Sequence, residues 1–375
     1  MTGGRPLPDL RAQPLPVFVQ LVAELREKPY RARQLFRWLH RRGAASLEEM
    51  SELPRGFREA LAERFTLPTL ARAEERRSTD GTIKWTWRTA DGLLVESVYM
   101  PHVGDGEDED EPANRDRRTL CVSTQVGCAM GCTFCLTGTM GLRRNLGAGE
   151  IADQVHRANR RLVELGEGPA PRPLTNLVFM GMGEPLHNFE ALKGALELLL
   201  HEEGPNFSHR HVTVSTSGLV PGIARLGAET SVKLAISLNA SHDAQRDVLM
   251  PLNRKWPLAE LLAACRGFPM KQGRRITFEY VLLGEVNDTD EDARRVARLV
   301  GGMPAKVNLI PYNANPGLPY GAPAPGRVEA FRAVLMGMGV TAVVRRNRGR
   351  DIAAACGQLA AGPGLPEAAE RRAAR

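Results

Sequence analysis

From about residue 119 onward, short apolar segments of strand length alternate with longer segments of helical periodicity. We expect strands at Leu120–Thr124, Leu174–Met180, Val212–Thr216, Val232–Leu238, Ile276–Leu282 and Lys306–Pro311, with helices between them such as 149–165, 188–202 and 288–301. Repeated strand–helix units pack as a parallel sheet whose neighbouring strands are joined by crossover helices. The pattern therefore predicts an α/β fold, either doubly wound or a full or partial barrel, with its chemistry at the carboxyl ends of the strands.

The residues before this region have a different character. The first 70 or so look helical, and Arg31–His40 repeats apolar residues at helical spacing with basic residues between them. Ser46–Glu49 fits a capping box that would open a further short helix. We interpret this part as a small all-α accessory domain with a basic face, whose position favours nucleic-acid binding over a role as a simple cap.

A β-hairpin is expected next. Thr82–Thr89 alternates apolar and polar residues, Asp91-Gly92 marks a turn, and Leu93–Met100 resumes the alternation. An acidic loop at 103–114 follows the hairpin. The chain is thus expected to divide into a helical accessory domain at 1–75, a hairpin and acidic linker at 76–118, the α/β region at 119–360 and a disordered tail at 361–375.

The charge balance favours a polyanionic partner. Lys and Arg number 50 and Asp and Glu 43, which gives a net charge of +7. Six acidic residues lie within Asp105–Glu111, so the rest of the chain is more basic than this total indicates. Such a surface fits nucleic acid, and a soluble basic protein without that partner is the alternative.

The sequence gives no sign of a membrane segment or of export. It has no apolar run approaching the roughly 18 residues that a membrane-spanning helix needs, and its first residues lack the apolar core of a signal peptide. We therefore expect a cytoplasmic protein that does not bind a membrane.

Three of the six cysteines are clustered. Cys128, Cys132 and Cys135 have the spacing C-x3-C-x2-C and directly follow the first expected strand of the α/β region. Thiolates favour zinc or iron–sulfur clusters. Structural zinc normally has four protein ligands, so a zinc site would need Cys121 or a distant histidine as the fourth. Three ligands on a four-iron cluster would instead leave one iron open for another molecule.

This motif and its surroundings resemble one family. The similarity runs from about residue 20 to 360 and is carried by the segments Cys121–Cys128, Gly138–Leu146, Gly181–Pro185 and Asp351–Gln358, in addition to the cysteine motif. Together they resemble the RlmN/Cfr family of radical S-adenosylmethionine (SAM) RNA methyltransferases. The resemblance implies a partial (β/α)6 barrel of the radical SAM type, with a small all-α N-terminal domain that binds RNA and a β-hairpin extension.

The resemblance also implies roles for individual residues. Cys128, Cys132 and Cys135 would hold a [4Fe–4S] cluster. SAM would be contacted by Gly183, Glu184, Ser215, Ser237, Leu238, Asn239 and Asn313. Cys356 would carry the methyl group, Cys121 would resolve the covalent intermediate through a disulfide bond, and Glu96 would accept a proton. The family often has histidine where this chain has Asn239, so a titrating group is not expected there. Cys265 matches no motif and is expected to be a packing residue.

The activity implied by the resemblance is methylation of C2 of adenine in 23S rRNA, before ribosome assembly is complete, and in tRNA. It would use two SAM molecules per turnover, an S-methylcysteine intermediate and a flavodoxin- or ferredoxin-type reductant, and we expect a monomer. Two alternatives remain from the sequence. One is a Cfr-type enzyme that methylates C8 of adenine, and the other is a non-catalytic iron–sulfur or zinc protein that binds RNA.

Overall fold

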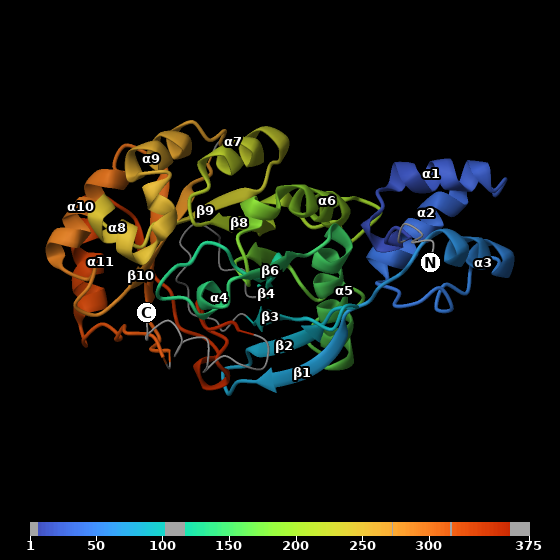
Figure 1. Cartoon of the computed structure of the whole chain (residues 1–375), viewed down its shortest axis with the longest axis horizontal. Helices are drawn as coiled ribbons and strands as arrows, with labels where there is room; N and C mark the ends of the chain where they lie inside the picture. Colours follow the sequence, from blue (N-terminus) through green and yellow to red (C-terminus); the bar gives the residue numbers. More distant parts are fainter. Residues whose placement is uncertain (1–6, 102–116, 272, 316, 361–375) are drawn as a thin grey trace, which may run out of the picture.

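The fold is described from a computed structural model, which covers residues 7–101, 117–271, 273–315 and 317–360. The acidic loop and the C-terminal tail that we expected lie outside these residues. The described part contains a ten-stranded sheet with the order β1-β2-β3-β4-β7-β8-β9-β10-β11-β12 and a separate two-stranded sheet of β5 and β6. Figure 1 shows the helices of the central region arranged around the larger sheet.

The parallel part of the sheet follows the order of the chain. Its strands are β4 (Thr119–Cys121), β7 (Asn176–Phe179), β8 (Val212–Thr216), β9 (Lys233–Ser237), β10 (Ile276–Leu282), β11 (Ala305–Pro311) and β12 (Ala342–Val344). Among the described residues, β12 pairs with β11 and not with β4, so the sheet stays open. The expected α/β fold of the partial-barrel type is therefore confirmed.

Helices connect successive strands, as the sequence pattern predicts. They are α5 (Ala148–Glu164), α6 (Phe189–Leu200), α7 (Val220–Glu229), α8 (Asp243–Leu249), α9 (Leu258–Arg266), α10 (Asp290–Val300) and α11 (Arg327–Gly337), with short 3-10 turns at η3 (Pro185–Asn188), η4 (His209–His211), η5 (Pro251–Arg254) and η6 (Arg350–Ile352). Strand residues such as Leu177, Val214 and Phe278 are fully buried beneath them. Most residues of the parallel strands are therefore buried.

An antiparallel extension continues the sheet beyond β4. It consists of β1 (Ala71–Arg77), β2 (Ile83–Arg88) and β3 (Leu94–Met100). The expected hairpin corresponds to β2 and β3. Strand β1 was not expected, and it begins inside the range 1–75 that we assigned to the helical domain. It has no apolar pattern because its main chain pairs with β2 while its charged side chains remain largely exposed.

The small sheet flanks the cysteine motif. Strands β5 (Gln125–Gly127) and β6 (Leu142–Asn145) pair on either side of the cysteine loop and of the single turn α4 (Leu136–Thr139). Gly127 has a φ of +78°, and a Cβ at this position would lie 1.9 Å from the Gly141 carbonyl oxygen. Only glycine fits this close crossing of the two strands.

The N-terminal helices form a separate layer, drawn in blue at one end of Figure 1. They are η1 (Leu10–Ala12), α1 (Leu15–Glu24), α2 (Tyr30–Phe36), the π-helical turn η2 (Arg37–Arg41) and α3 (Arg55–Arg64). The helix expected after Ser46 is absent, and residues 46–49 form turns. The Glu49 carboxylate instead pairs with Arg160 of α5, 2.8 Å away.

Buried ionisable side chains join this layer to α5. Arg11 donates to the carbonyl oxygens of Leu39 (3.3 Å) and Ala44 (2.9 Å), and its Nε lies 3.3 Å from Asp153 Oδ1. Beside it, His40 Nδ1 and His156 Nε2 are 3.4 Å apart. Burial lowers the pKa of both histidines well below its usual value.

Candidate active site

The three motif cysteines lie in the loop between β5 and α4. Burial raises the pKa of the Cys128 thiol to about 12, and the pKa of Cys132 is raised by burial and by its two cysteine neighbours. The three sulfurs are thus close enough to influence one another. Among the residues that the structure describes, no set of three or more His, Cys, Asp or Glu side chains is arranged to hold a single metal ion. The donor set, thiols only and on one loop, has the chemistry of iron–sulfur ligation.

The segment after β7 approaches the cysteine loop closely. Gly183 has a φ of +101°, and a Cβ there would lie 2.6 Å from the Gln125 Cβ, so a larger residue is excluded. The carboxylate of Glu184 is buried and accepts hydrogen bonds from the Ser217 backbone N–H and Oγ (both 2.7 Å) and from the Leu186 N–H (3.1 Å). This side chain therefore holds the ends of β7 and β8 together.

The remaining expected SAM contacts lie at neighbouring strand ends. Ser215 is the second-last residue of β8, Ser237 ends β9 with Leu238 buried beyond it, and Asn313 follows β11. Asn313 Oδ1 accepts a hydrogen bond from Asn347 Nδ2 (3.0 Å). The fold thus brings these residues to one edge of the sheet, as expected for a parallel architecture.

Asn239 has a structural reason to be asparagine. Its φ is +54°, a left-handed conformation in which asparagine is enriched. Its Oδ1 accepts from the Val281 N–H (2.8 Å), which extends the β9–β10 pairing, and its Nδ2 lies 3.4 Å from Met250 Sδ. Its carbonyl oxygen accepts from Asn287 Nδ2 (2.9 Å). The side chain is therefore engaged by the fold.

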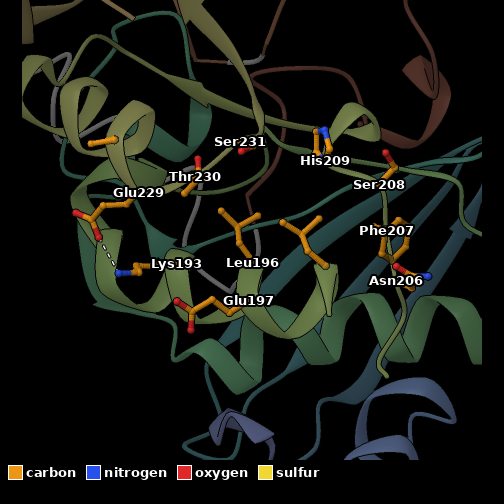
Figure 2. A pocket seen from close by; sticks show the side chains of 12 residues that line it. Lys193, Leu196, Glu197, Asn206, Phe207, Ser208, His209, Glu229, Thr230 and Ser231 are labelled. Carbon is orange, nitrogen blue, oxygen red and sulfur yellow. Dashed lines mark hydrogen bonds and ion pairs between the residues drawn. The ribbon is translucent and has the colours of Figure 1, made fainter. Parts of the chain in front are cut away.

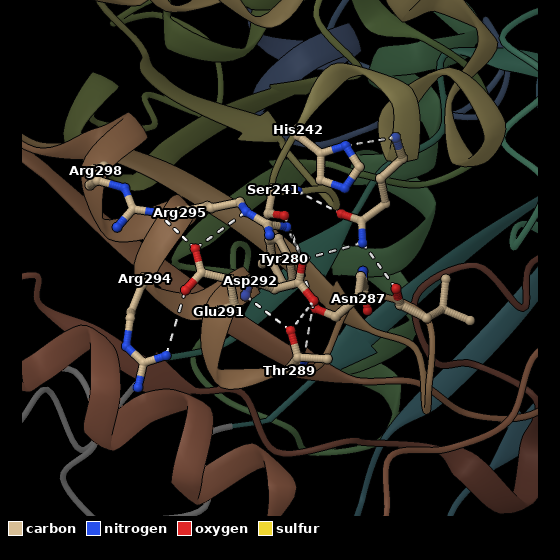
Figure 3. A network of polar contacts seen from close by, with 12 residues as sticks. Ser241, His242, Tyr280, Asn287, Thr289, Glu291, Asp292, Arg294, Arg295 and Arg298 are labelled. Atoms are coloured by element: carbon tan, nitrogen blue, oxygen red, sulfur yellow. Dashed lines mark hydrogen bonds and ion pairs between the residues drawn. The ribbon is translucent and has the colours of Figure 1, made fainter.

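A network of polar contacts joins the loop after β9, which contains Asn239, to the start of α10 (Figure 3). Asp292 of α10 accepts hydrogen bonds from Ser241 Oγ and from Thr289 Oγ1 (2.6 Å), and Thr289 and Asp292 also form the capping box of this helix through their backbone N–H groups. Tyr280 donates to the carbonyl oxygen of Asn287 (2.8 Å). The loop after β9 is consequently fixed to α10 rather than free.

Arg246 is a buried residue that sequence reasoning missed. From α8 it donates to the carbonyl oxygens of Ser217 (2.6 Å), Ser237 (3.1 Å) and Leu238 (3.1 Å), and to Asn253 Oδ1 (3.1 Å). It therefore ties the ends of β8 and β9 together. An isolated arginine in a polar helix carries no sequence signal of such a role.

The loop that carries Cys356 lies against the cysteine loop. The Leu136 N–H donates to the Gly357 carbonyl oxygen (2.9 Å), and Thr137 Oγ1 donates to that of Leu359 (2.5 Å). Cys356 itself is exposed. Burial, with a smaller contribution from the neighbouring Cys356, raises the pKa of Cys121 to about 12, so the two side chains lie within reach of each other's charge.

All six cysteines are free thiols, so the expected Cys121–Cys356 disulfide is not formed in this structure. Cys265 is fully buried in α9 and belongs to the hydrophobic core, in agreement with a packing role.

Glu96 is buried in β3, with both carboxylate oxygens engaged. Oε1 lies 3.2 Å from Lys84 Nζ and 3.5 Å from Thr86 Oγ1, and Oε2 accepts from the Ala360 N–H (2.9 Å). Its role as a proton acceptor stays a prediction.

Several arginines near these loops have partners within the chain. Arg144 pairs with Asp91 (2.7 Å) and Glu150 (2.8 Å), and Arg348 donates to the Pro101 carbonyl oxygen. The side chains of Arg143 in β6, Arg346 after β12 and Arg350 in η6 are exposed.

A surface cavity of about 710 Å³ lies elsewhere (Figure 2). It is formed by α6, α7 and the segment before β8, and Lys193 and Glu229 form an ion pair of 2.8 Å at its edge. It contains none of the residues singled out from the sequence.

Comparison with known proteins defines the class. A family model described as the radical SAM superfamily matches residues 122–297, and one described as the ribosomal RNA large subunit methyltransferase N-terminal domain matches residues 7–67. A crystal structure of a radical SAM methyltransferase from Sphaerobacter thermophilus superposes with a TM-score of 0.85 at 47% identity, over 94% of this chain and 98% of that chain. The fold and the cysteine loop are thus those of a radical SAM methyltransferase.

Sequence relatives narrow the assignment. A dual-specificity RNA methyltransferase RlmN from Anaeromyxobacter dehalogenans is 70% identical over 98% of this chain and 95% of the relative. A protein with the same description from Geobacter sulfurreducens is 48% identical over 88% of this chain and 86% of the relative. The chain belongs to the RlmN family. No helix in the described part of the chain is long and apolar enough to span a membrane.

Proposed function

We propose that this chain methylates C2 of adenine 2503 in 23S rRNA and of adenine 37 in tRNA, with Cys356 as the methyl carrier. The observation that carries the proposal is the contact between the Cys356 loop and the cysteine motif. The Gly357 carbonyl oxygen, next to Cys356, accepts from the N–H of Leu136, which directly follows the third motif cysteine. A methyl group on Cys356 that must give a hydrogen atom to a radical generated at this motif needs such proximity.

The donor set fits the cofactors of the family. Cys128, Cys132 and Cys135 would hold a [4Fe–4S] cluster, and the strand-end residues from Gly183 to Asn313 would hold SAM. When bound, the cluster and SAM supply a 5′-deoxyadenosyl radical, and the protein supplies position and surroundings.

The two remaining active-site cysteines have distinct tasks. Exposed Cys356 accepts a methyl group as a thiolate and then delivers its carbon to the adenine. Buried Cys121 afterwards attacks the Cys356 sulfur. This forms the disulfide, breaks the bond between sulfur and the product carbon, and leaves the electron pair on that carbon, where a proton completes the methyl group. Glu96 is proposed to take the proton that leaves adenine C2.

Partners follow from this chemistry. The exposed Arg143, Arg346 and Arg350, with the N-terminal helices, are proposed to contact RNA phosphates. A flavodoxin- or ferredoxin-type protein would supply electrons, and a thiol reductant would reopen the disulfide. The cytoplasm, where thiols remain reduced, is the proposed location, and a monomer the proposed state.

The test is a methylation assay with anaerobically reconstituted protein on protein-free 23S rRNA and on tRNA. Nuclease digests analysed by mass spectrometry against standards should contain 2-methyladenosine. Finding 8-methyladenosine would establish the Cfr-type reaction, and loaded protein without any methylation would refute the proposal. Cys356→Ala should be inactive, and Cys265→Ala is the matched control that should remain active.

A further inference from the structure

A buried ion pair connects two strands of the hairpin. Lys84 of β2 and Glu96 of β3 are 6% and 4% exposed, and their charged groups are 3.2 Å apart. In the register of the hairpin Thr86 opposes Glu96, which makes Lys84 a diagonal neighbour on the same face of the sheet. From sequence alone a lysine in a hairpin strand is expected to be solvated, so its burial calls for a partner beyond the hairpin.

That partner is the C-terminal segment. Lys84 Nζ donates to the Ala353 carbonyl oxygen (3.0 Å), while Glu96 Oε2 accepts from the Ala360 N–H (2.9 Å). Ala353 and Ala360 are the two ends of the loop that contains Cys356. The two side chains of one ion pair therefore hydrogen-bond to opposite ends of this loop, and the ion pair connects these two hydrogen bonds.

The loop has a conformation that needs such support. Ala353 has a φ of +51°, a left-handed conformation that is unfavourable for a residue with a side chain. Gly357 has a φ of +80°. Because Cys356 is exposed, packing around its own side chain does not fix it. Its position depends on the loop ends and on the hydrogen bonds that Leu136, Thr137 and Asn315 donate to the carbonyl oxygens of Gly357 and Leu359.

We propose that Lys84 is a positioning residue which, with Glu96, fixes the ends of the loop 353–360 and thereby sets the place of the Cys356 sulfur. The inference rests on the proposed function, because this place matters only if Cys356 carries the methyl group. It also gives the Glu96 carboxylate a task that requires no proton transfer.

Two variants release the loop from different sides. Lys84→Met removes the ammonium group but keeps the length of the side chain. Ala360→Pro removes the N–H that Glu96 accepts, also restrains φ at residue 360, and leaves the ion pair in place. Lys84→Arg keeps the charge and should restore most of the function. Lys193→Met is the matched control, since Lys193 also pairs with a glutamate, Glu229, but lies on the outer helices.

The expected result has two parts. Amide hydrogen exchange followed by mass spectrometry should be faster in the peptide spanning 350–360 for Lys84→Met and Ala360→Pro, with the barrel strands unchanged. With reconstituted enzyme, kcat should fall by about 100-fold, the usual scale for a misplaced reacting group, while the KM for SAM and the iron content remain those of the wild type. Lys193→Met should match the wild type in both assays.

Wild-type exchange and kcat in both variants would overturn the inference. A parallel loss of iron content or SAM affinity would do the same, because it would indicate a general structural role for Lys84. If Lys84→Met does not fold, Ala360→Pro decides alone. Hydrogen exchange needs no turnover, so a wild-type protein without methyl transfer would refute the proposed function while leaving this readout intact.

Discussion

Acid should destabilise the junction between the N-terminal helices and α5. His40 and His156 are buried there as neutral rings, with pKa values well below the usual one. In the unfolded chain each histidine takes up a proton below a pKa of roughly 6.5. A depressed folded pKa gives stability that is present above pH 6.5 and is lost as the pH falls.

Asp9 acts in the opposite direction. Burial raises its pKa from 3.8 to about 6, so the folded protein keeps a proton that the unfolded chain releases. Its contribution is complete below the unfolded pKa and is lost as the pH rises through about 6. Near pH 5 the unfolded chain therefore binds about two protons at these three sites and the folded chain about one. The free energy of unfolding should fall by roughly 1.4 kcal/mol per pH unit of acidification from these groups.

The measurement is urea unfolding of the apoprotein at several pH values between 4.5 and 6. His40→Gln removes one proton from the unfolded side of the balance and should flatten the slope by the same roughly 1.4 kcal/mol per unit. An unchanged slope in His40→Gln, or a His40 or His156 ring of the folded protein titrating near pH 6.5 by NMR, would refute the reasoning.

Four further outcomes are expected. Cys132→Ala should lose the visible absorbance and iron of a bound cluster, because two remaining thiolates hold it poorly. Cys121→Ala should accumulate a covalent protein–RNA adduct that resists denaturant, and Cys356→Ala should give none, as seen by gel mobility and peptide mass. RNA affinity should fall steeply with salt, and Arg346→Glu should weaken it further in a filter-binding assay without altering SAM cleavage. Arg246→Met should lower both the melting temperature and SAM affinity, since the carbonyl groups at three strand-end residues lose their donor.

The parallel strands could be predicted because their signal is local. Val212–Thr216 and Ile276–Leu282 have the expected bounds, since each is a short run rich in β-branched and aromatic residues that the fold buries almost completely. Strand β1, Ala71–Arg77, has no such run. Its side chains are mostly charged and exposed, and only pairing with β2 makes it a strand. The helix predicted from the capping box at Ser46–Glu49 is absent, and the Glu49 carboxylate pairs instead with Arg160 of α5, a contact that the local sequence does not indicate.

The residues of the site also differ in whether a local sequence pattern or a contact between distant segments indicates them. The cysteine motif is a short pattern with few alternatives, so the sequence could single it out, whereas the strand-end glycines are a weak pattern and were singled out only by the resemblance to the family. Lys84 depends on a carbonyl group 269 residues away and Arg246 on carbonyl groups at the ends of other strands, and nothing in the sequence marks these groups as acceptors. Glu184 shows the intermediate case. It was identified by its motif, but the use of its carboxylate to join β7 and β8 is visible only in three dimensions.

The contacts at the Cys356 loop have a consequence for synthesis on the ribosome. Each parallel strand pairs with the strand made just before it, so the sheet can grow as the chain emerges. The hydrogen bonds to the loop span 269 residues between Lys84 and Ala353 and 264 between Glu96 and Ala360. Lys84 and Glu96 are therefore synthesised early, and their hydrogen bonds to the loop form only after the last part of the chain has been made. A nascent or truncated chain can complete most of its barrel, but it cannot place the sulfur that carries the methyl group, so an unfinished enzyme holds no assembled reaction centre.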